Sequence, residues 1–368
     1  MKDNRKIKVG ITHGDINGIG YEVILKALED PRMTELCTPV IYGSAKIAAY
    51  YRKGADLPQF NMYTAASASE VRDGEVNIIN VVPEDTRIEP GVASKAAGEA
   101  AFIALERAVA DMRNGDIDVL VTAPINKDSI QSDTFRFPGH TEYLEASVGD
   151  GDKSLMVLCS GDLRVALVTT HLPIAKVSGA ITREAILEKL SIFNRSLRRD
   201  FAIQAPRIAV LALNPHAGEN GLLGKEEQEV IAPAIEEAAK GGMLVFGPYA
   251  ADGFFGSEAY MKFDGVLAMY HDQGLAPFKT IAMESGVNFT AGLPFVRTSP
   301  DHGTGFDIAG KGEASEESMR EAIYMAIDVF RHRNDYDYAY RSPLRKQYFD
   351  KSKDNVVLDL SKDDSDHD

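Results

Sequence analysis

Val266-Leu267-Ala268-Met269, followed at once by Tyr270-His271-Asp272-Gln273-Gly274, is the stretch that decides the fold class. A short apolar run bounded by polar residues is typical of a strand buried on both faces of a parallel sheet. The polar residues follow at the carboxyl end of that strand, where open α/β sheets bind their ligands. The stretch therefore predicts an α/β protein with a candidate site just beyond this strand.

The same strand pattern recurs along the chain. Short β-branched runs predict six further strands, at Ile7–Thr12, Val40–Tyr42, Val76–Val82, Val119–Thr122, Val165–Thr169 and Ile208–Leu213. Between them, segments 23–28 and 186–193 have apolar residues at helical spacing, and 225–240 begins with glutamates and ends at a glycine pair. The alternation predicts helices over both faces of one or two sheets.

Composition and charge narrow the classes of function. The formal charge of −15 would repel a nucleic-acid backbone, so we expect no nucleic-acid partner. The apolar run that ends at Thr12 is too short for a signal peptide, and no later run reaches the length of a membrane span. Cys37 and Cys159 lie far apart, in no metal or redox spacing. We therefore expect a globular protein of the reducing cytoplasm with no membrane partner.

Three of the eight histidines share one kind of position. His171, His216 and His271 each lie just past a predicted strand. Three imidazoles meeting at one sheet edge would form a divalent metal site with an open position. For any single one of them, an ordinary loop histidine is the more frequent case, so the metal hypothesis depends on the trio.

A predicted helix start and two glycine-rich stretches are further candidates. His140 and Thr141 lie at the helix start, where free backbone amides favour an anion, although a plain helix cap explains them equally well. Residues 14–20 and 301–312 are rich in glycine, but neither matches the G-x-G-x-x-G fingerprint of dinucleotide-binding folds. On the residues alone, tight loops with positive φ account for both stretches.

Longer motifs resemble the 4-hydroxythreonine-4-phosphate dehydrogenase family. They are Gly18-Ile19-Gly20, Gly139-His140-Thr141-Glu142, the stretches 213–219, 264–274, 286–288 and 292–299, and Asp301-His302-Gly303-Thr304. They occur in family order from about Ile7 to about Ile327, which makes the resemblance specific. One departure is Tyr21, which stands at the end of a start segment that usually reads G-E-P-A-G-I-G-P.

The resemblance implies an α/β fold like that of isocitrate and isopropylmalate dehydrogenases, with two α/β/α subdomains and a cleft between them. Residues 1–128 plus 276–368 would form the cofactor-binding subdomain, and residues 129–275 the metal, substrate and dimerisation subdomain. The cofactor would be NAD or NADP. Its implied binding residues are Gly18, Gly20, His302, Gly303, Thr304 and Asp307.

The resemblance also implies the active-site residues. His171, His216 and His271 would hold one zinc, cobalt or magnesium ion, shared across the interface of a homodimer. A small phosphorylated amino acid would bind at the family's substrate positions, which here are His140, Thr141, Lys279, Asn288 and Arg297. Asp252 and Asp272 would lie near the metal, where Asp272 could orient His271.

The implied reaction is oxidation of 4-(phosphooxy)-L-threonine to a β-keto acid. This product would lose carbon dioxide to give 3-amino-2-oxopropyl phosphate, a step in pyridoxal 5'-phosphate biosynthesis. Related enzymes act on D-threonate or D-erythronate 4-phosphate, or on aromatic cis-dihydrodiols, so another secondary alcohol is the nearest alternative. A metal-dependent hydrolase or lyase, or a catalytically silent binding protein, would be alternatives from other classes.

Overall fold

One mixed sheet organises the part of the chain that the structure describes. The computed structural model describes residues 5–341 apart from residues 55, 58–59 and 134. A 12-stranded sheet has the order β3-β4-β2-β1-β5-β12-β11-β6-β7-β10-β8-β9. Its strands are β1 (Ile7–Thr12), β2 (Cys37–Gly43), β3 (Met62–Ala65), β4 (Val76–Asn80), β5 (Val119–Thr122), β6 (Leu155–Ser160), β7 (Leu163–Leu167), β8 (Arg207–Leu211), β9 (Leu244–Tyr249), β10 (Gly265–Ala268), β11 (Val287–Ala291) and β12 (Val296–Pro300).

Helices connect these strands and cover both faces of the sheet. The α-helices are α1 (Gly20–Ala27), α2 (Arg32–Leu36), α3 (Ala45–Gly54), α4 (Lys95–Arg113), α5 (His140–Val148), α6 (Ile174–Ala180), α7 (Arg183–Arg199), α8 (Ala232–Lys240), α9 (Ala251–Gly256), α10 (His271–Ala282) and α11 (Glu317–Tyr340). Three short elements complete the set, namely η1 (Pro215–Gly221), η2 (Glu227–Ile231) and η3 (Ala259–Lys262). None of the helices described here is long and apolar enough to cross a membrane.

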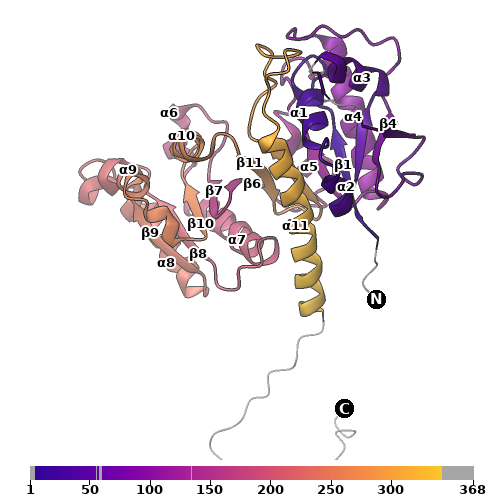
Figure 1. Ribbon diagram of the computed structural model, residues 1–368. Coiled ribbons are helices and arrows are strands. Elements are labelled where there is room, and N and C mark those ends of the chain that lie inside the picture. The colour runs from indigo at the N-terminus through magenta and orange to yellow at the C-terminus, as the bar shows by residue number, and fades with distance from the viewer. Residues whose placement is uncertain (1–4, 55, 58–59, 134, 342–368) are drawn as a thin grey trace, which may run out of the picture.

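The pairing changes direction in the middle of the sheet. Strands β1 to β5 and β12 pair in parallel, and so do β7, β10, β8 and β9. Between these two parallel blocks, β11 pairs antiparallel with both β12 and β6, and β6 pairs antiparallel with β7. The antiparallel centre joins two lobes, which Figure 1 shows side by side with α11 running down between them.

Alternate side chains of the buried strands enter different cores. In β5, Val119 and Val121 belong to the core that includes α1 and α11, whereas Leu120 belongs to the core that includes α4. In β10, Leu267 enters the first of these cores, and Val266 enters a third core beneath α10. A strand buried on both faces must be apolar at every position, which is why its sequence shows no alternation.

The predicted α/β class is confirmed, and each of the seven predicted strands is present. The strands that the prediction missed are β3, β6, β9, β11 and β12. The predicted helix over 225–240 is a π-helical turn, η2, followed by α8. The predicted subdomain boundaries stay a prediction; the one at 275/276 falls inside α10, and residues 342–368 lie outside the described residues.

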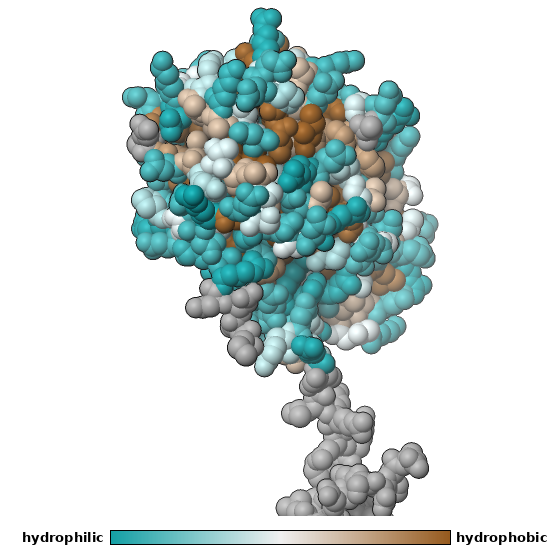
Figure 2. All heavy atoms as spheres, turned by 90° about the vertical axis from the view of Figure 1, so that its right-hand side faces the viewer, coloured by the Kyte–Doolittle hydropathy of each residue, from teal (hydrophilic) through white to brown (hydrophobic). Residues whose placement is uncertain are grey.

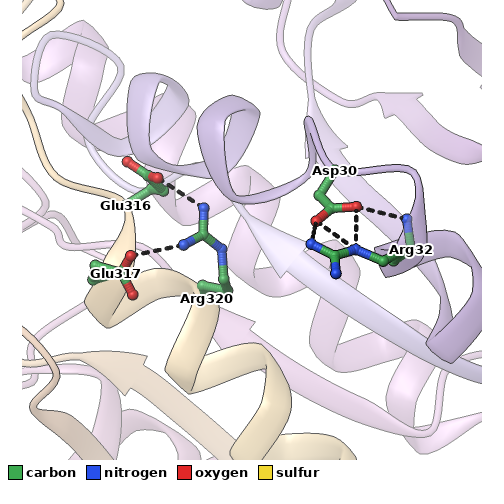
Figure 3. A network of polar contacts seen from close by, with 5 residues as sticks. All are labelled: Asp30, Arg32, Glu316, Glu317 and Arg320. Atoms are coloured by element: carbon green, nitrogen blue, oxygen red, sulfur yellow. Dashed lines mark hydrogen bonds and ion pairs between the residues drawn. The ribbon is translucent and has the colours of Figure 1, made fainter.

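Surface ion pairs lie at the start of α11. Arg320 donates to Glu316 at 2.7 Å and to Glu317 at 2.8 Å, and Asp30 pairs with Arg32 nearby (Figure 3). Exposed pairs of this kind contribute about 0–1 kcal/mol each, so the buried apolar face of α11 holds it in place. The outer face of the N-terminal lobe is largely hydrophilic, with a small apolar patch near its top (Figure 2).

Candidate active site

A cavity of about 910 Å³ lies between the two lobes. Its lining combines the residues that follow β5 and β12 with those that follow β7 and β10. Most of the predicted site residues line this one cavity, namely His140, Thr141, His171, His271, Asp272, Lys279, Asn288, Arg297, His302 and Gly303. The structure therefore brings together residues that are far apart in the sequence.

His171 and His271 lie side by side because their strands are parallel neighbours. The β7–β10 ladder continues past both strands, since the Val168 amide donates to the Ala268 carbonyl at 2.9 Å. The two imidazole centroids are 5.7 Å apart. Nδ1 of His271 lies 2.7 Å from the Asp272 carboxylate, which orients the ring and leaves Nε2 free. A carboxylate that orients an imidazole in this way is common around protein-bound metals.

The charge state of His171 also suits a metal ligand. Burial lowers the pKa of His171, and the positive charge of Lys127 lowers it further. The imidazole is therefore neutral at neutral pH, which is the form that binds metal ions. Nε2 of His171 lies 3.4 Å from the Lys127 ammonium.

His216 lines a different cavity of the same chain. This second cavity, of about 510 Å³, also contains Asp252, Tyr270 and Asp272, so it adjoins the first one through Asp272. His216 is exposed there. Within the described residues of one chain, no three His, Cys, Asp or Glu side chains lie together as a metal site. A single chain thus pairs His171 with His271, and the predicted meeting of all three histidines stays a prediction.

His216 begins a left-handed turn. Its φ and ψ are 51° and 30°, and Ala217, Gly218, Glu219 and Asn220 all have positive φ as well. Left-handed backbone costs about 1–2 kcal/mol per residue that bears a side chain, so the surroundings must hold the turn. The buried Glu227 carboxylate does so from η2, because it accepts hydrogen bonds from the Leu213 and Asn214 amides at 2.8 and 2.7 Å.

Arg297 is the buried cation of the first cavity. It is 3% exposed, and its guanidinium donates to the hydroxyl oxygens of Thr122, at 2.6 and 3.1 Å, and Thr290, at 3.2 Å. Burial lowers the pKa of Arg297 to about 10, and only the charge of Glu142 opposes that shift. Arg297 is therefore a positive charge that awaits an anion in the cavity.

The amino end of α5 faces the same cavity as Arg297. His140 is the first residue of α5, and no side chain caps the helix at Gly139. Burial lowers the pKa of His140 well below its usual value, and the charges of Arg297 and Lys127 add to the effect. Uncapped amides, a neutral imidazole and the Thr141 hydroxyl supply hydrogen-bond donors for a phosphate group.

Two further predicted substrate residues come from β11, the strand paired with β12, and from α10. Asn288 on β11 has a buried side-chain oxygen with no partner among the described residues. Lys279 on α10 lies 3.5 Å from the Asp301 carboxylate and donates to the Asp301 carbonyl at 3.2 Å. The charge of Lys279 is thus already balanced, which distinguishes it from Arg297.

The two predicted cofactor stretches contact each other. The Ile19 amide donates to the Thr304 carbonyl at 2.9 Å, and a Cβ on Gly18 would lie 2.6 Å from that same oxygen. Gly20 is equally constrained, because a Cβ there would lie 2.1 Å from the His13 carbonyl. Glycine is required at both positions by these close approaches. Asp307 is exposed on the second stretch, and His302 and Gly303 reach the first cavity.

Several residues of the cavity received no role from the sequence. They include Lys127, Glu142, Glu145, Lys153, Glu188, Lys189 and Asp301. Lys127 lies in the loop that follows β5, five residues after Thr122, so its position past a strand end could have marked it. Glu142 and Asp301 belong to recognised motifs, but nothing in the sequence shows that their side chains face the cavity.

Known proteins share this sequence and fold. The family model described as "Pyridoxal phosphate biosynthetic protein PdxA" matches residues 35–326. The chain is 59% identical over 366 residues to a 4-hydroxythreonine-4-phosphate dehydrogenase of Bacteroides thetaiotaomicron, with 100% of both chains covered. It is 40% identical over 331 residues to a putative D-threonate 4-phosphate dehydrogenase of Oceanobacillus iheyensis, which covers 89% of this chain and 98% of that protein.

A solved structure supports the same grouping. The crystal structure of 4-hydroxythreonine-4-phosphate dehydrogenase from Klebsiella pneumoniae superposes with a TM-score of 0.78 at 35% identity, covering 90% of this chain and 99% of that one. The resemblance seen in the sequence motifs is therefore confirmed over nearly the whole chain. The chain belongs to the PdxA family of pyridoxal phosphate biosynthetic proteins.

Proposed function

We propose that this protein oxidises 4-(phosphooxy)-L-threonine with NAD or NADP to a β-keto acid, which then loses carbon dioxide to give 3-amino-2-oxopropyl phosphate. The observation that carries the proposal is one cavity holding an imidazole pair, His171 and His271, together with the buried, uncompensated Arg297. Oxidation of an alcohol that lies close to an anionic group requires both a metal-binding imidazole pair and a cation that binds the anion. The name of the relative in Bacteroides thetaiotaomicron, 4-hydroxythreonine-4-phosphate dehydrogenase, supports the substrate.

Different residues of the cavity would bind different groups of the substrate. The phosphate dianion would lie at the amino end of α5, where the Thr141 hydroxyl and the uncapped amides donate and Arg297 supplies charge. Asn288 would donate to the substrate through its side-chain amide from β11, the strand paired with β12. These contacts would hold the secondary alcohol beside the imidazole pair and close to the His302 loop.

His171 and His271 fit a divalent metal, because both are neutral-imidazole donors and Asp272 orients one of them. When bound, such an ion polarises the alcohol and a nicotinamide accepts the hydride. His302 and Gly303 reach the cavity, and the Gly18–Thr304 contact supports their loop. His302 also has a buried ring nitrogen with no partner among the described residues, which suits a nearby nicotinamide.

A homodimer would complete the site. His216 is exposed, and it lines a cavity that shares Tyr270 and Asp272 with a cavity lined by His171 and His271. Exposed large apolar side chains are numerous in this lobe, among them Leu172, Ile174, Leu222, Leu223, Phe246 and Met261. An apolar surface of this kind is typical of an interface between subunits. We therefore assign His216 to the metal site of the partner subunit. The buried free thiols of Cys37 and Cys159 favour the reducing cytoplasm.

An assay of cofactor reduction tests this function. The purified protein is given NAD or NADP and one of three alcohols, namely 4-(phosphooxy)-L-threonine, D-threonate 4-phosphate and D-erythronate 4-phosphate, with and without a chelator. We expect reduction with the aminated substrate and loss of the rate on chelation. A rate only with the non-aminated acids would reject the substrate. Turnover without any cofactor reduction would indicate a hydrolase or lyase.

A further inference from the structure

Lys127 is a cation of the cavity without a carboxylate partner. Among the described residues, Lys153 pairs with Glu145 at 3.2 Å and Lys189 pairs with Glu188 at 3.2 Å. Lys279 is likewise balanced by Asp301. Lys127 has no ion pair in the part of the chain that the structure describes, although the chain carries a charge of −15.

The ammonium of Lys127 faces into the site. It lies 3.4 Å from Nε2 of His171, and its charge lowers the pKa of His171 and of His140. It therefore lies beside the imidazole at the reacting end of the cavity, and its charge acts on a second imidazole at the amino end of α5. Lys127 is exposed, so a ligand that enters the cavity can reach its ammonium group.

The backbone that carries Lys127 is well anchored. The Asn126 side chain accepts from the amides of Asp128 and Ser129 at 3.1 and 2.8 Å, which forms an Asx turn. The side-chain amide of Gln131 donates to the Lys127 carbonyl at 3.1 Å. These hydrogen bonds hold the Lys127 backbone in place, which reduces the conformational entropy that is lost when a ligand binds.

His171 has one free acceptor atom, and two groups compete for it. Nε2 is the atom that contacts Lys127, and it is also the atom through which His171 would bind a metal. With a metal on Nε2, the ammonium requires a different acceptor. The substrate of the proposed function has two anionic groups, whereas Arg297 is the other cation of the cavity that has no ion pair among the described residues.

We propose that Lys127 binds an anionic oxygen of the substrate, as the second unneutralised cation of the site beside Arg297. The inference rests on the proposed function, because it assumes a substrate with two anionic groups. Both the carboxylate and the phosphate offer the required oxygen. Lys127 is thereby a substrate-binding residue.

The test compares Lys127→Gln with Lys127→Arg and with Lys153→Gln as a matched control, since Lys153 is a cavity lysine whose charge is already paired. We expect Lys127→Gln to raise the KM for 4-(phosphooxy)-L-threonine roughly 10- to 100-fold, as for loss of a hydrogen bond to a charged group. Lys127→Arg should recover most of the affinity, and Lys153→Gln should change KM less than about threefold.

Calorimetric titration with two partial substrates identifies the group that Lys127 contacts. The probes are 4-hydroxy-L-threonine, which lacks the phosphate, and 3-amino-2-hydroxypropyl phosphate, which lacks the carboxylate. Weaker binding of either probe to Lys127→Gln supports the proposal and names the anion. Unchanged affinity for both probes and an unchanged KM would overturn it.

Metal content, measured on the same variants, tests whether Lys127 supports the metal ligand His171 and does not bind the substrate. If Lys127→Gln loses bound metal while binding the probes normally, Lys127 acts on His171 and the proposal is wrong. The proposed function fails separately, through a wild-type protein that does not oxidise the full substrate. The titrations with partial substrates still decide the role of Lys127 in that case.

Discussion

Replacing Arg297 by Met should weaken substrate binding without weakening the fold. Burial lowers the pKa of Arg297 from its usual value to about 10, so the folded protein disfavours the charged guanidinium. At roughly 1.36 kcal/mol per pKa unit this is about 3 kcal/mol of destabilisation. Both the folded and the unfolded chain carry the charge below pH 10, so the destabilisation is present throughout the neutral range and is relieved only as pH rises above about 10.

The substitution removes this penalty together with the hydrogen bonds of the guanidinium. Thr122 and Thr290 lose their donor, which costs about 1–3 kcal/mol for hydroxyl groups in a buried site. The two effects nearly cancel, so we expect Arg297→Met to unfold in urea with a free energy equal to the wild-type value or about 1–2 kcal/mol higher. The affinity for substrate should fall by about 2–5 kcal/mol, the usual effect of removing one partner of a buried charge pair.

Urea unfolding with and without 4-(phosphooxy)-L-threonine measures both quantities. The wild-type protein should be stabilised by the substrate, as a ligand that binds only the folded state requires, and the variant should not. Arg297→Lys serves as the control that keeps the charge but loses the planar donor set. A loss of more than about 2 kcal/mol in Arg297→Met without ligand would show that Arg297 is a structural residue and would refute the reasoning.

Three further predictions follow from other parts of the chain. Burial lowers the pKa of His13 to about 4, so this residue alone should cost the protein up to about 3 kcal/mol of unfolding free energy as pH falls from 6.5 to 4. In urea titrations at pH 7 and 4.5, His13→Phe should therefore lose about 2–3 kcal/mol less than the wild type, and an equal loss in both proteins would contradict the prediction. Glu219 has a φ of 42°, a left-handed conformation that glycine adopts without strain, so Glu219→Gly should raise the unfolding free energy by about 1 kcal/mol. The control Glu236→Gly in α8 should lower it by about as much, and a fall in both variants would show that the turn is not strained. Glu227→Gln should weaken the affinity for the metal roughly 10- to 100-fold, because the Leu213 and Asn214 amides before His216 no longer donate to a carboxylate. A metal content equal to that of the wild type would count against this role.

The sequence was sufficient for the inner strands of the two parallel blocks, and insufficient for the centre of the sheet and for its two edge strands, β3 and β9. Strands such as β5 and β10 are apolar at every position because helices cover both faces, and this pattern is visible without a structure. The strands of the antiparallel centre include polar residues such as Asn288 and Arg297, which face the cavity and break the pattern. Missed strands and site residues therefore coincide in β11 and β12, whereas β3 and β9 were missed because these edge strands are only partly buried.

The position of individual site residues depended on strand order, which the sequence does not reveal. Lys127 follows β5 and His171 follows β7, and three strands lie between these two in the sheet. Their contact at 3.4 Å arises from the way the cavity closes between the lobes. The left-handed turn at His216 was equally hidden, since four of the five residues in it bear side chains that rarely adopt positive φ.

Tyr21 shows how a departure from the family pattern is accommodated. Its hydroxyl accepts a hydrogen bond from the Ser44 amide at 2.8 Å, and its ring stacks between those of His13 and Tyr51 at centroid distances of 5.2 and 5.8 Å. The ring therefore fills buried space behind the Gly18–Gly20 loop and leaves the cavity unchanged. The sequence alone registered the departure, and the packing explains why it does not disturb the site.

The central claim is that His216 of one subunit joins His171 and His271 of the other around one metal ion. A mixture of His216→Ala and His171→Ala subunits tests it, because each homodimer lacks one ligand at both sites. About half of the dimers in an equal mixture contain one subunit of each kind, and each of these would have one intact site. We predict that reassociation restores about a quarter of the wild-type rate and metal content from two inactive proteins; a mixture that stays as inactive as its parents would contradict the shared site.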